Sequence, residues 1–249
     1  MHIGSWIVFF CLVTPLALAS QYFPAHHWPW PAGPYGALVR QGFHIVQDTH
    51  RYAGPYARAH VSCTNCHLAG GARAYAAPLD VYGLFPSYQK RWRTVETLNE
   101  RVQDCFLFSE NGKAPPLDGH VVTAVLAYIQ WISHGQRIGI RPEGVGFVDP
   151  GPKPQGADRM LGRSIYRTVC ASCHGARGQG TRGKPPLWGP KSYNAGAGLA
   201  KPKMLAAFVL HNMPANMPGI LIPKGAWAVA EYVDSEPRPP APLVHRTFP

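Results

Sequence analysis

The sequence predicts an all-α fold made of two tandem halves, and three observations lead to this prediction. The pentapeptides CTNCH, residues 63–67, and CASCH, residues 170–174, share one pattern, and their first cysteines lie 107 positions apart (170 minus 63). Apolar residues with helical periodicity precede each pentapeptide and recur near the end of each half. Between the halves, residues 141–156 read RPEGVGFVDPGPKPQG, where Pro and Gly interrupt the apolar pattern and predict a linker.

The N-terminal segment, residues 1–19, is predicted to be a cleaved signal peptide. It contains an apolar run from Ile7 to Leu18 and ends in Ala-Leu-Ala before Ser20, which is the small-residue pattern of a cleavage site. No Lys or Arg precedes the run, so a retained anchor is the alternative, although the run is short for a bilayer span. No other stretch is apolar enough to cross a membrane. The sequence therefore predicts an exported protein without stable membrane insertion.

The N-terminal half, residues 20–140, is predicted to place one helix on each side of its pentapeptide. The first helix is expected over YGALVRQGFHIVQDT, residues 35–49, and the second over DGHVVTAVLAYIQWIS, residues 118–133. Asp118 is the expected N-cap of the second helix, because a carboxylate can accept from the unpaired N–H groups of a first turn.

The C-terminal half, residues 157–249, repeats this plan. DRMLGRSIYRTVCASCH, residues 158–174, carries apolar residues on one helical face and leads directly into the second pentapeptide. A closing helix is expected over KGAWAVAEYVDS, residues 224–235. Gly162 would let these two helices cross closely, because it has no side chain. The repeated order of helix, pentapeptide, long loop and helix suggests a duplication.

Both pentapeptides follow CxxCH, the attachment signal of haem c. The two thiols can add to the vinyl groups of one porphyrin, and the histidine can ligate its iron. A zinc or redox pair is the alternative, but no further cysteine pair is present to complete a zinc site. We therefore expect two covalently bound haem c groups, two cytochrome c-type domains and, because bacteria attach haem c there, a periplasmic location. The predicted haem residues are Cys63, Cys66, Cys170 and Cys173 for attachment and His67 and His174 for the iron.

A haem iron held by one histidine needs a ligand on its other face, usually Met or His. Residues 20–159 contain no methionine, so only the second haem can have one. The segment HNMPANMPG, residues 211–219, precedes the closing helix, where cytochromes c commonly present this ligand. Met213 is the predicted ligand and Met217 the first alternative. The remaining alternatives are His211, Met204 and Lys203.

The first haem must use a different ligand, and Cys105 has the corresponding position. It follows His67 by 38 residues, whereas Met213 follows His174 by 39. A thiolate is a strong donor to ferric iron and lowers its reduction potential. The alternative is an unreactive Cys105 beside a haem with two histidine ligands. The histidines available for that role are His44, His50, His60, His120 and His134.

Positive charge favours an anionic substrate. The formal net charge of +11 attracts anions and steers acidic redox partners, whereas nucleic acid is excluded as a partner of an exported haem protein. Arg91, Arg93 and Arg101 precede Cys105 by 14, 12 and 4 residues, and Arg101 would share its side of a helix. A guanidinium fork suits an oxyanion, although a solvated helix face is the alternative for any single arginine.

Four segments together resemble a known family. They are VSCTNCHLAGGARAYAAPL, FPSYQKRWRTVETLNERVQDCFLFSENG, PPLWGPKSYNAGAG and AEYVDSEPRP. They are similar to the dihaem thiosulfate dehydrogenases, relatives of the cysteine-ligated cytochromes of the sulfur-oxidising multienzyme system. The resemblance implies an active site at the first haem, with Cys105 as its ligand and Arg91, Arg101 and Ser109 around thiosulfate. Phe108 stands where many members carry arginine.

The expected activity is oxidation of two thiosulfate ions to tetrathionate. Electrons would leave through the second haem to an external acceptor, such as a small cytochrome c or another high-potential redox protein. Three alternatives remain. The chain could be a dihaem electron carrier, a subunit of a thiosulfate-oxidising complex that acts on a carrier protein, or an enzyme working mainly as a tetrathionate reductase.

Overall fold

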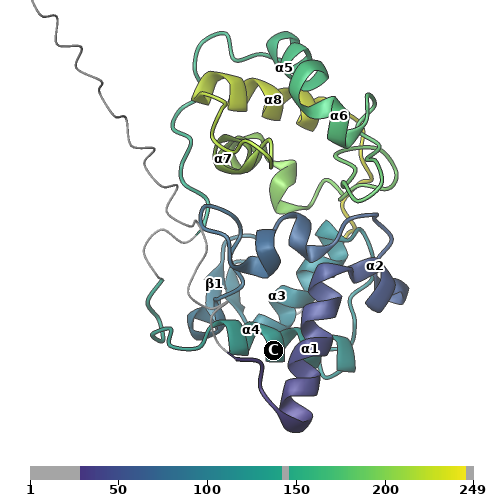
Figure 1. The fold of residues 1–249 in the computed structure, drawn as a ribbon, viewed down its shortest axis with the longest axis vertical. Helices are drawn as coiled ribbons and strands as arrows, with labels where there is room; N and C mark the ends of the chain where they lie inside the picture. The colour runs from purple at the N-terminus through teal and green to yellow at the C-terminus, as the bar shows by residue number, and fades with distance from the viewer. Residues whose placement is uncertain (1–28, 142–145, 245–249) are drawn as a thin grey trace, which may run out of the picture.

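The computed structural model describes residues 29–141 and 146–244, and its helices form two groups, one above the other in the view of Figure 1. The predicted signal peptide lies outside the described residues, as do residues 142–145 of the predicted linker. Within the described ranges, no helix is both long enough and apolar enough to span a membrane. The fold is predominantly helical, as predicted.

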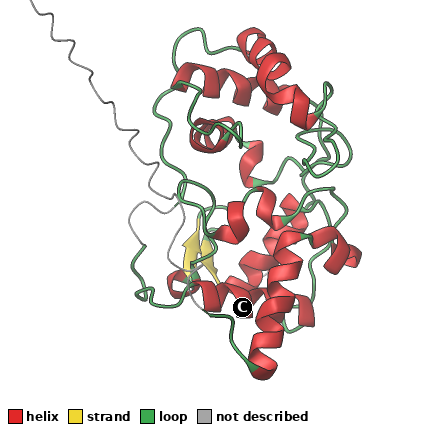
Figure 2. Ribbon diagram, in the orientation of Figure 1, coloured by secondary structure: helices red, strands yellow, loops and turns green. Residues whose placement is uncertain are grey.

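The lower group in Figure 1 comes from the first half of the chain and includes one small antiparallel hairpin, drawn in yellow in Figure 2. Its elements are α1 (Gly33–Gln47), α2 (Thr49–Tyr52), β1 (Ser87–Gln89), β2 (Thr94–Glu96), α3 (Leu98–Asp104) and α4 (His120–Ile132). Short 3₁₀ turns cover Gly54–Tyr56, Cys63–Asn65, Leu68–Gly71 and Tyr82–Leu84, and a π-helical turn covers Cys105–Ser109.

The upper group comes from the second half. Its elements are α5 (Arg159–Ile165), a π-helical turn (Tyr166–Cys170), α6 (Ala171–His174), a 3₁₀ turn (Gly198–Ala200), α7 (Pro202–Asn212) and α8 (Pro223–Ser235). The helix predicted to lead into the second pentapeptide is therefore present, with a wider turn inside it. The closing helix is α8, which begins one residue earlier than predicted.

The two long helices of the first half are also present, but one detail of their prediction was wrong. The N-cap of α4 is Gly119 and not Asp118, since Thr123 N–H donates to Gly119 O at 3.0 Å to close the first helical turn. Gly119 N–H in turn donates to Pro116 O at 3.0 Å. This tight turn places Asp118 one residue before the capping position, so its carboxylate makes no cap.

The same close helix crossing occurs in both halves. A Cβ atom on Gly42 of α1 would lie 2.0 Å from the carbonyl oxygen of Ala124 in α4. A Cβ atom on Gly162 of α5 would lie 1.9 Å from the carbonyl oxygen of Ala228 in α8, and each would also meet a tyrosine Cβ at 2.8 Å. The predicted role of Gly162 is confirmed, and α1 crosses α4 in the same way.

Each half has its own core of buried apolar side chains. Val39, Val122 and Ile129 belong to the first core, between α1 and α4. The second core lies between α5, α7 and α8 and also contains Phe108, which comes from the π-helical turn of the first half. The helix that carries Cys105 is thus packed against the second half of the chain.

Candidate haem and substrate site

The first pentapeptide is held in a compact turn in which both thiols are half-buried. Ser62 N–H donates to Asn65 Oδ1 at 2.7 Å, and Cys63 N–H donates to Thr49 Oγ1 at 3.1 Å. His67 N–H donates to Cys63 O at 2.8 Å, which brings the histidine back beside the first cysteine. Burial, together with the nearby charges of acidic and thiol groups, raises the pKa of Cys66 to about 12.

The histidines of both pentapeptides are oriented in the same way. His67 Nδ1 lies 2.9 Å from Ala77 O, and His174 Nδ1 lies 2.9 Å from Pro185 O. A carbonyl only accepts, so each Nδ1 carries the proton and Nε2 keeps a free lone pair for a metal. Burial lowers the pKa of His67 to about 4 and also lowers the pKa of His174. Both rings are therefore neutral near pH 7, which is the form that ligates iron.

The cysteines fit attachment of haem c better than a zinc site. All five cysteines within the described residues are free thiols. In that part of the chain, no group of three or more His, Cys, Asp or Glu side chains could hold a metal ion. Paired thiols beside an imidazole with a free Nε2 match the donors that a covalently bound haem needs.

Cys105 lies where α3 widens into a π-helical turn. The capping box of Thr97 and Glu100 fixes the start of α3, because each side chain accepts from the other residue's backbone N–H. At the end of the helix, Glu110 N–H donates to Cys105 O at 3.0 Å, which is an i to i+5 bond. Such π turns are frequent at functional sites. Ser109 ends this turn and is half-buried.

The thiol of Cys105 lies close to the first pentapeptide and to Arg101. After burial and Glu110, the charge of Cys105 is a further cause that raises the pKa of Cys66. Burial raises the pKa of Cys105 itself, and the cation of Arg101 is the largest opposing influence. In return, the thiolate of Cys105 is the main cause that raises the pKa of Arg101. The structure thus brings Arg101 and Cys105 together beside the first haem motif.

Arg91 lies on the hairpin between β1 and β2, and the second half of the chain holds it. Its guanidinium donates to Gly196 O, and its Cζ lies 4.3 Å from the centre of the Phe108 ring. Burial lowers the pKa of Arg91, while Asp104 is the largest influence that raises it. The phenylalanine that stands in place of the family's arginine therefore supports the cation of Arg91 through a cation–π contact.

Glu110 is a member of this cluster that the sequence analysis missed. It is buried, and Cys63 Sγ lies 3.9 Å from its Oε1 atom. Among the described residues, its Oε2 atom has no hydrogen-bond partner, and burial raises its pKa well above the usual range. It follows Cys105 by five residues. Residues five apart lie on the same side of a π turn but not of an α-helix. A search of the sequence for helical spacings of three or four residues therefore could not find Glu110 as a neighbour of Cys105.

The candidates for the outer ligand of the predicted second haem occupy different environments. Met213 follows α7 directly as its C-cap residue and packs half-buried against the second core. Met217 is 54% exposed, whereas Met204 is half-buried in α7. Lys203 forms an ion pair with Asp149 at 2.8 Å. The segment 211–219 was expected to be a loop, but His211 and Asn212 belong to α7, which ends before Met213.

The histidines considered as alternative ligands of the predicted first haem all lie at the surface. His44 stacks on Tyr52 at 5.3 Å, and the rings of His50 and His60 also lie 5.3 Å apart. The five side chains are exposed, namely those of His44, His50, His60, His120 and His134. Their exposure contrasts with Cys105, which is half-buried, as is the first pentapeptide.

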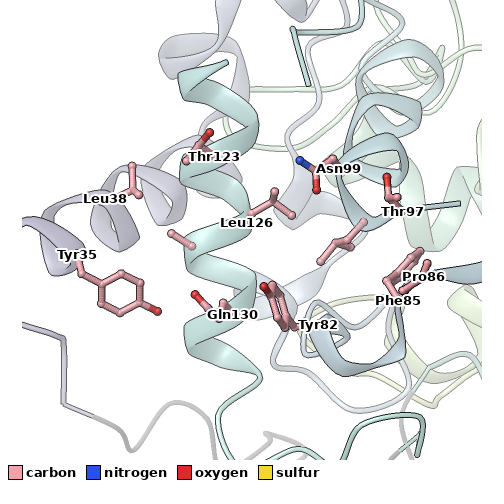
Figure 3. A pocket seen from close by; sticks show the side chains of 12 residues that line it. Tyr35, Leu38, Tyr82, Phe85, Pro86, Thr97, Asn99, Thr123, Leu126 and Gln130 are labelled. Atoms are coloured by element: carbon pink, nitrogen blue, oxygen red, sulfur yellow. The ribbon is translucent and has the colours of Figure 1, made fainter. Parts of the chain in front are cut away.

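A cavity of about 430 Å³ opens elsewhere in the first half, as Figure 3 shows. Tyr35 of α1, Leu126 of α4 and Asn99 of α3 are among the residues that line it. Asn99 lies in the first turn of α3, whereas Cys105 follows the last turn. None of the predicted site residues lines this cavity, so it is separate from the candidate substrate site.

The chain is similar to known proteins over most of its length. The family model "Cytochrome c" matches residues 160–236. The thiosulfate dehydrogenase of Stutzerimonas stutzeri is 42% identical over 230 residues, which are 90% of this chain and 75% of that protein. The thiosulfate dehydrogenase of Allochromatium vinosum is 35% identical over 222 residues, which are 84% of this chain and 81% of that protein.

A solved structure extends the likeness to the fold. The thiosulfate dehydrogenase (TsdBA) from Marichromatium purpuratum superposes with a TM-score of 0.84 at 36% identity. The superposition covers 94% of this chain but only 53% of that one, so the present chain spans about half of it. With a cytochrome c domain in its second half and relatives of this identity over most of its length, the chain belongs to the thiosulfate dehydrogenase family.

Proposed function

We propose that this enzyme joins two thiosulfate ions into one tetrathionate ion at Cys105 and passes on the two electrons released. The observation that most supports this proposal is the electrostatic coupling of the Cys105 thiol both to Cys66 of the first CxxCH motif and to the cation of Arg101. A sulfur nucleophile, a redox centre and a cation are the three components that an oxidative coupling of sulfur dianions needs.

The proposed enzyme has two cytochrome c-type domains, residues 20–140 and 157–249, joined by the linker 141–156. The family model covers only the second of them. The repeated helix crossing at Gly42 and Gly162 supports a second domain of the same kind, as does the shared orientation of His67 and His174.

Two domains of this kind predict two covalently bound haem c groups per chain. The pyridine haemochrome spectrum of the purified protein, referred to its protein concentration, measures this number. A value of two is expected, because each half offers two thiols and one oriented histidine. A value of one would overturn the two-domain proposal but not the family assignment.

Cationic side chains would bring the substrates together. Two thiosulfate dianions repel each other, and a nearby cation lowers that cost most where water is scarce. We assign this role to Arg101 and Arg91, with the Ser109 hydroxyl as a hydrogen-bond donor to the sulfonate oxygens. Arg101 lies beside Cys105, and Arg91 is held in place by Phe108 and Gly196.

Haem c, when bound at the first motif, supplies an iron for the Cys105 thiolate and a one-electron acceptor. In the proposed first step, Cys105 Sγ forms a bond with the outer sulfur of one thiosulfate. One thiolate and one thiosulfate dianion become a cysteine S-thiosulfonate with one negative charge, and two electrons leave. In the second step, the outer sulfur of another thiosulfate attacks the sulfur atom that joins Cys105 Sγ to the sulfonate group. This attack releases tetrathionate and restores the thiolate. The two steps together convert two thiosulfate ions to one tetrathionate ion and two electrons, without a net proton.

The electrons would leave through the second domain, with His174 and Met213 as iron ligands. The half-buried position of Met213 beside the second core supports its assignment over the exposed Met217. The acceptor would be a small cytochrome c or another high-potential redox protein. With residues 1–19 as a signal peptide, the reaction would take place in the periplasm.

The ligand assignment predicts that Met213→Ala removes the absorption band of Met-ligated ferric haem near the red end of the visible spectrum. Met217→Ala is the matched control and should keep this band, because Met217 is 54% exposed. The spectrum of the first haem should be unchanged in both variants. Loss of the band in Met217→Ala instead would assign the ligand to Met217.

A steady-state assay of the isolated protein, run in both directions with artificial electron acceptors and donors, tests the proposed function. We expect thiosulfate oxidation without any added protein. A pure electron carrier would show no activity with either substrate. A subunit of a multienzyme complex would need its partner proteins, and a tetrathionate reductase would run mainly in the opposite direction.

A further inference from the structure

A loop of the second half closes over the helix that carries Cys105. The loop follows the second haem motif and contains residues 191–197, from Lys191 to Ala197. Lys191 O accepts from His60 N–H at 2.8 Å, and Asn194 N–H donates to Phe108 O at 3.1 Å. The loop thus contacts the first half close to the candidate substrate site, on the π-helical turn Cys105–Ser109.

The π turn leaves two backbone carbonyls without partners in their own helix. Gly112 N–H donates to Phe106 O at 2.9 Å, and Lys113 N–H turns away to Tyr56 O at 3.1 Å. If the π-helical pattern continued, Gly112 N–H would donate to Leu107 O and Lys113 N–H would donate to Phe108 O. Both carbonyls therefore lack a partner within their own helix. Buried carbonyls of this kind need a donor from elsewhere in the protein.

Asn194 supplies both bonds. Its side-chain Nδ2 donates to Leu107 O at 2.8 Å and to Asn111 Oδ1 at 3.1 Å. Its backbone N–H donates to Phe108 O. Asn194 is completely buried. It therefore acts as a C-terminal cap for the helix of Cys105, but from the other half of the chain, 87 residues away.

Further contacts fix Asn194 itself. Its Oδ1 atom accepts from Gly196 N–H at 2.9 Å, and Gly196 O accepts from the guanidinium of Arg91. Gly196 must lack a side chain, because a Cβ atom there would lie 2.4 Å from Phe108 Cδ1. Ala195 N–H donates to Pro239 O at 2.9 Å, which ties the loop to the segment after α8. One short loop thus holds both the π turn and Arg91.

We propose that Asn194 is a positioning residue of the thiosulfate site, acting through the π turn on Cys105, Ser109 and Arg91. Without its side-chain amide, the turn loses the partner of Leu107 O, although the backbone N–H of residue 194 still faces Phe108 O. The turn can then rewind to the narrower α-helical form. Glu110 would then rotate away from the face of Cys105, because a residue five positions further on shares that face only in the wider turn. This inference rests on the proposed function, because it takes Cys105 as the iron ligand and reaction centre.

The test uses the full-length holoprotein and two changes at one position. Asn194→Leu removes the polar groups at similar volume, and Asn194→Asp keeps the shape but replaces the donor amide with a carboxyl group. The control is Asn99→Asp on α3, whose amide donates to Leu117 O within the first half. The readouts are the ferric electron paramagnetic resonance spectrum, in which thiolate-ligated haem is distinct, and kcat and KM for thiosulfate.

We expect both variants at Asn194 to keep their full haem content but to show a shifted or heterogeneous thiolate signal. Loss of the side-chain partner of Leu107 O should lower kcat/KM by roughly tenfold or more, whereas Asn99→Asp should match the wild type. The Asn194→Asp variant should recover part of the loss at about pH 6 relative to about pH 9, because a protonated carboxyl group can again donate. A merely structural residue would not give this spectral change with pH-dependent rescue.

The outcomes separate the inference from the proposed function. If the wild-type protein lacks a thiolate signal, the assignment of Cys105 fails and the proposed function with it. If the wild type shows the signal and Asn194→Asp keeps both signal and kinetics at high pH, Asn194 has no positioning role. Should Asn194→Leu fail to accumulate as holoprotein, the isosteric Asn194→Asp variant decides the question alone.

Discussion

Cys105→Met is expected to abolish tetrathionate formation while haem stays covalently attached. Methionine can still bind iron, but its thioether cannot form the S-thiosulfonate that the proposed first step requires. Turnover of thiosulfate should fall by at least about a thousandfold, as expected when a covalent nucleophile is lost. The haem anchors are other cysteines, so the haem content per chain should not change.

The same variant should also raise the reduction potential of the first haem, because a neutral thioether replaces an anionic donor. A spectroelectrochemical titration measures this potential separately from turnover. If Cys105 only tuned the potential of an electron carrier, the potential would change without a catalytic loss. A raised potential together with near-normal turnover would therefore remove Cys105 from the reaction.

Gly162→Ala is expected to have the largest effect on folding stability. The added Cβ atom would lie 1.9 Å from Ala228 O and 2.8 Å from Tyr232 Cβ, so α5 and α8 must move apart. Overpacking of this kind costs roughly 1–3 kcal/mol or more, which lowers the Tm of a chain of this size by about 2–4 °C per kcal/mol.

Gly198→Ala is the matched control in the same half. A Cβ atom there would meet nothing within 4 Å, and its φ lies outside the left-handed region. Thermal unfolding of the two holoproteins, followed by circular dichroism, compares the changes directly. Equal Tm values for the two variants would show that α5 and α8 do not pack as closely as described.

Periodicity and motif spacing predicted much of this structure. The helices on either side of each CxxCH motif could be found because their apolar residues repeat at helical intervals. Gly162 could be assigned to a close helix crossing, because a glycine inside a helical pattern costs stability and usually has a role in packing. A spacing of four residues on one helix predicted that Arg101 and Cys105 share a side, and in the structure the charge of Cys105 raises the pKa of Arg101.

Other parts of the site depend on features that single-sequence reasoning does not detect. The π turn at Cys105 has no separate signal in residue type, so Glu110 could not be placed beside Cys63. Asn194 meets the helix of Cys105 only after the two halves pack together. The wrong N-cap at Asp118 has a simpler cause, since a tight turn shifted the start of α4 by one residue.

The central claim is that this one chain couples thiosulfate at Cys105 without help from another protein. Its most direct test is an anaerobic single-turnover measurement, in which thiosulfate is added to the oxidised protein with no external acceptor. Haem reduction is followed by absorption, and the tetrathionate formed is quantified. We predict one tetrathionate for every two electrons taken up by the haems, and no tetrathionate from Cys105→Met. Haems that stay oxidised in the presence of excess thiosulfate would contradict the claim.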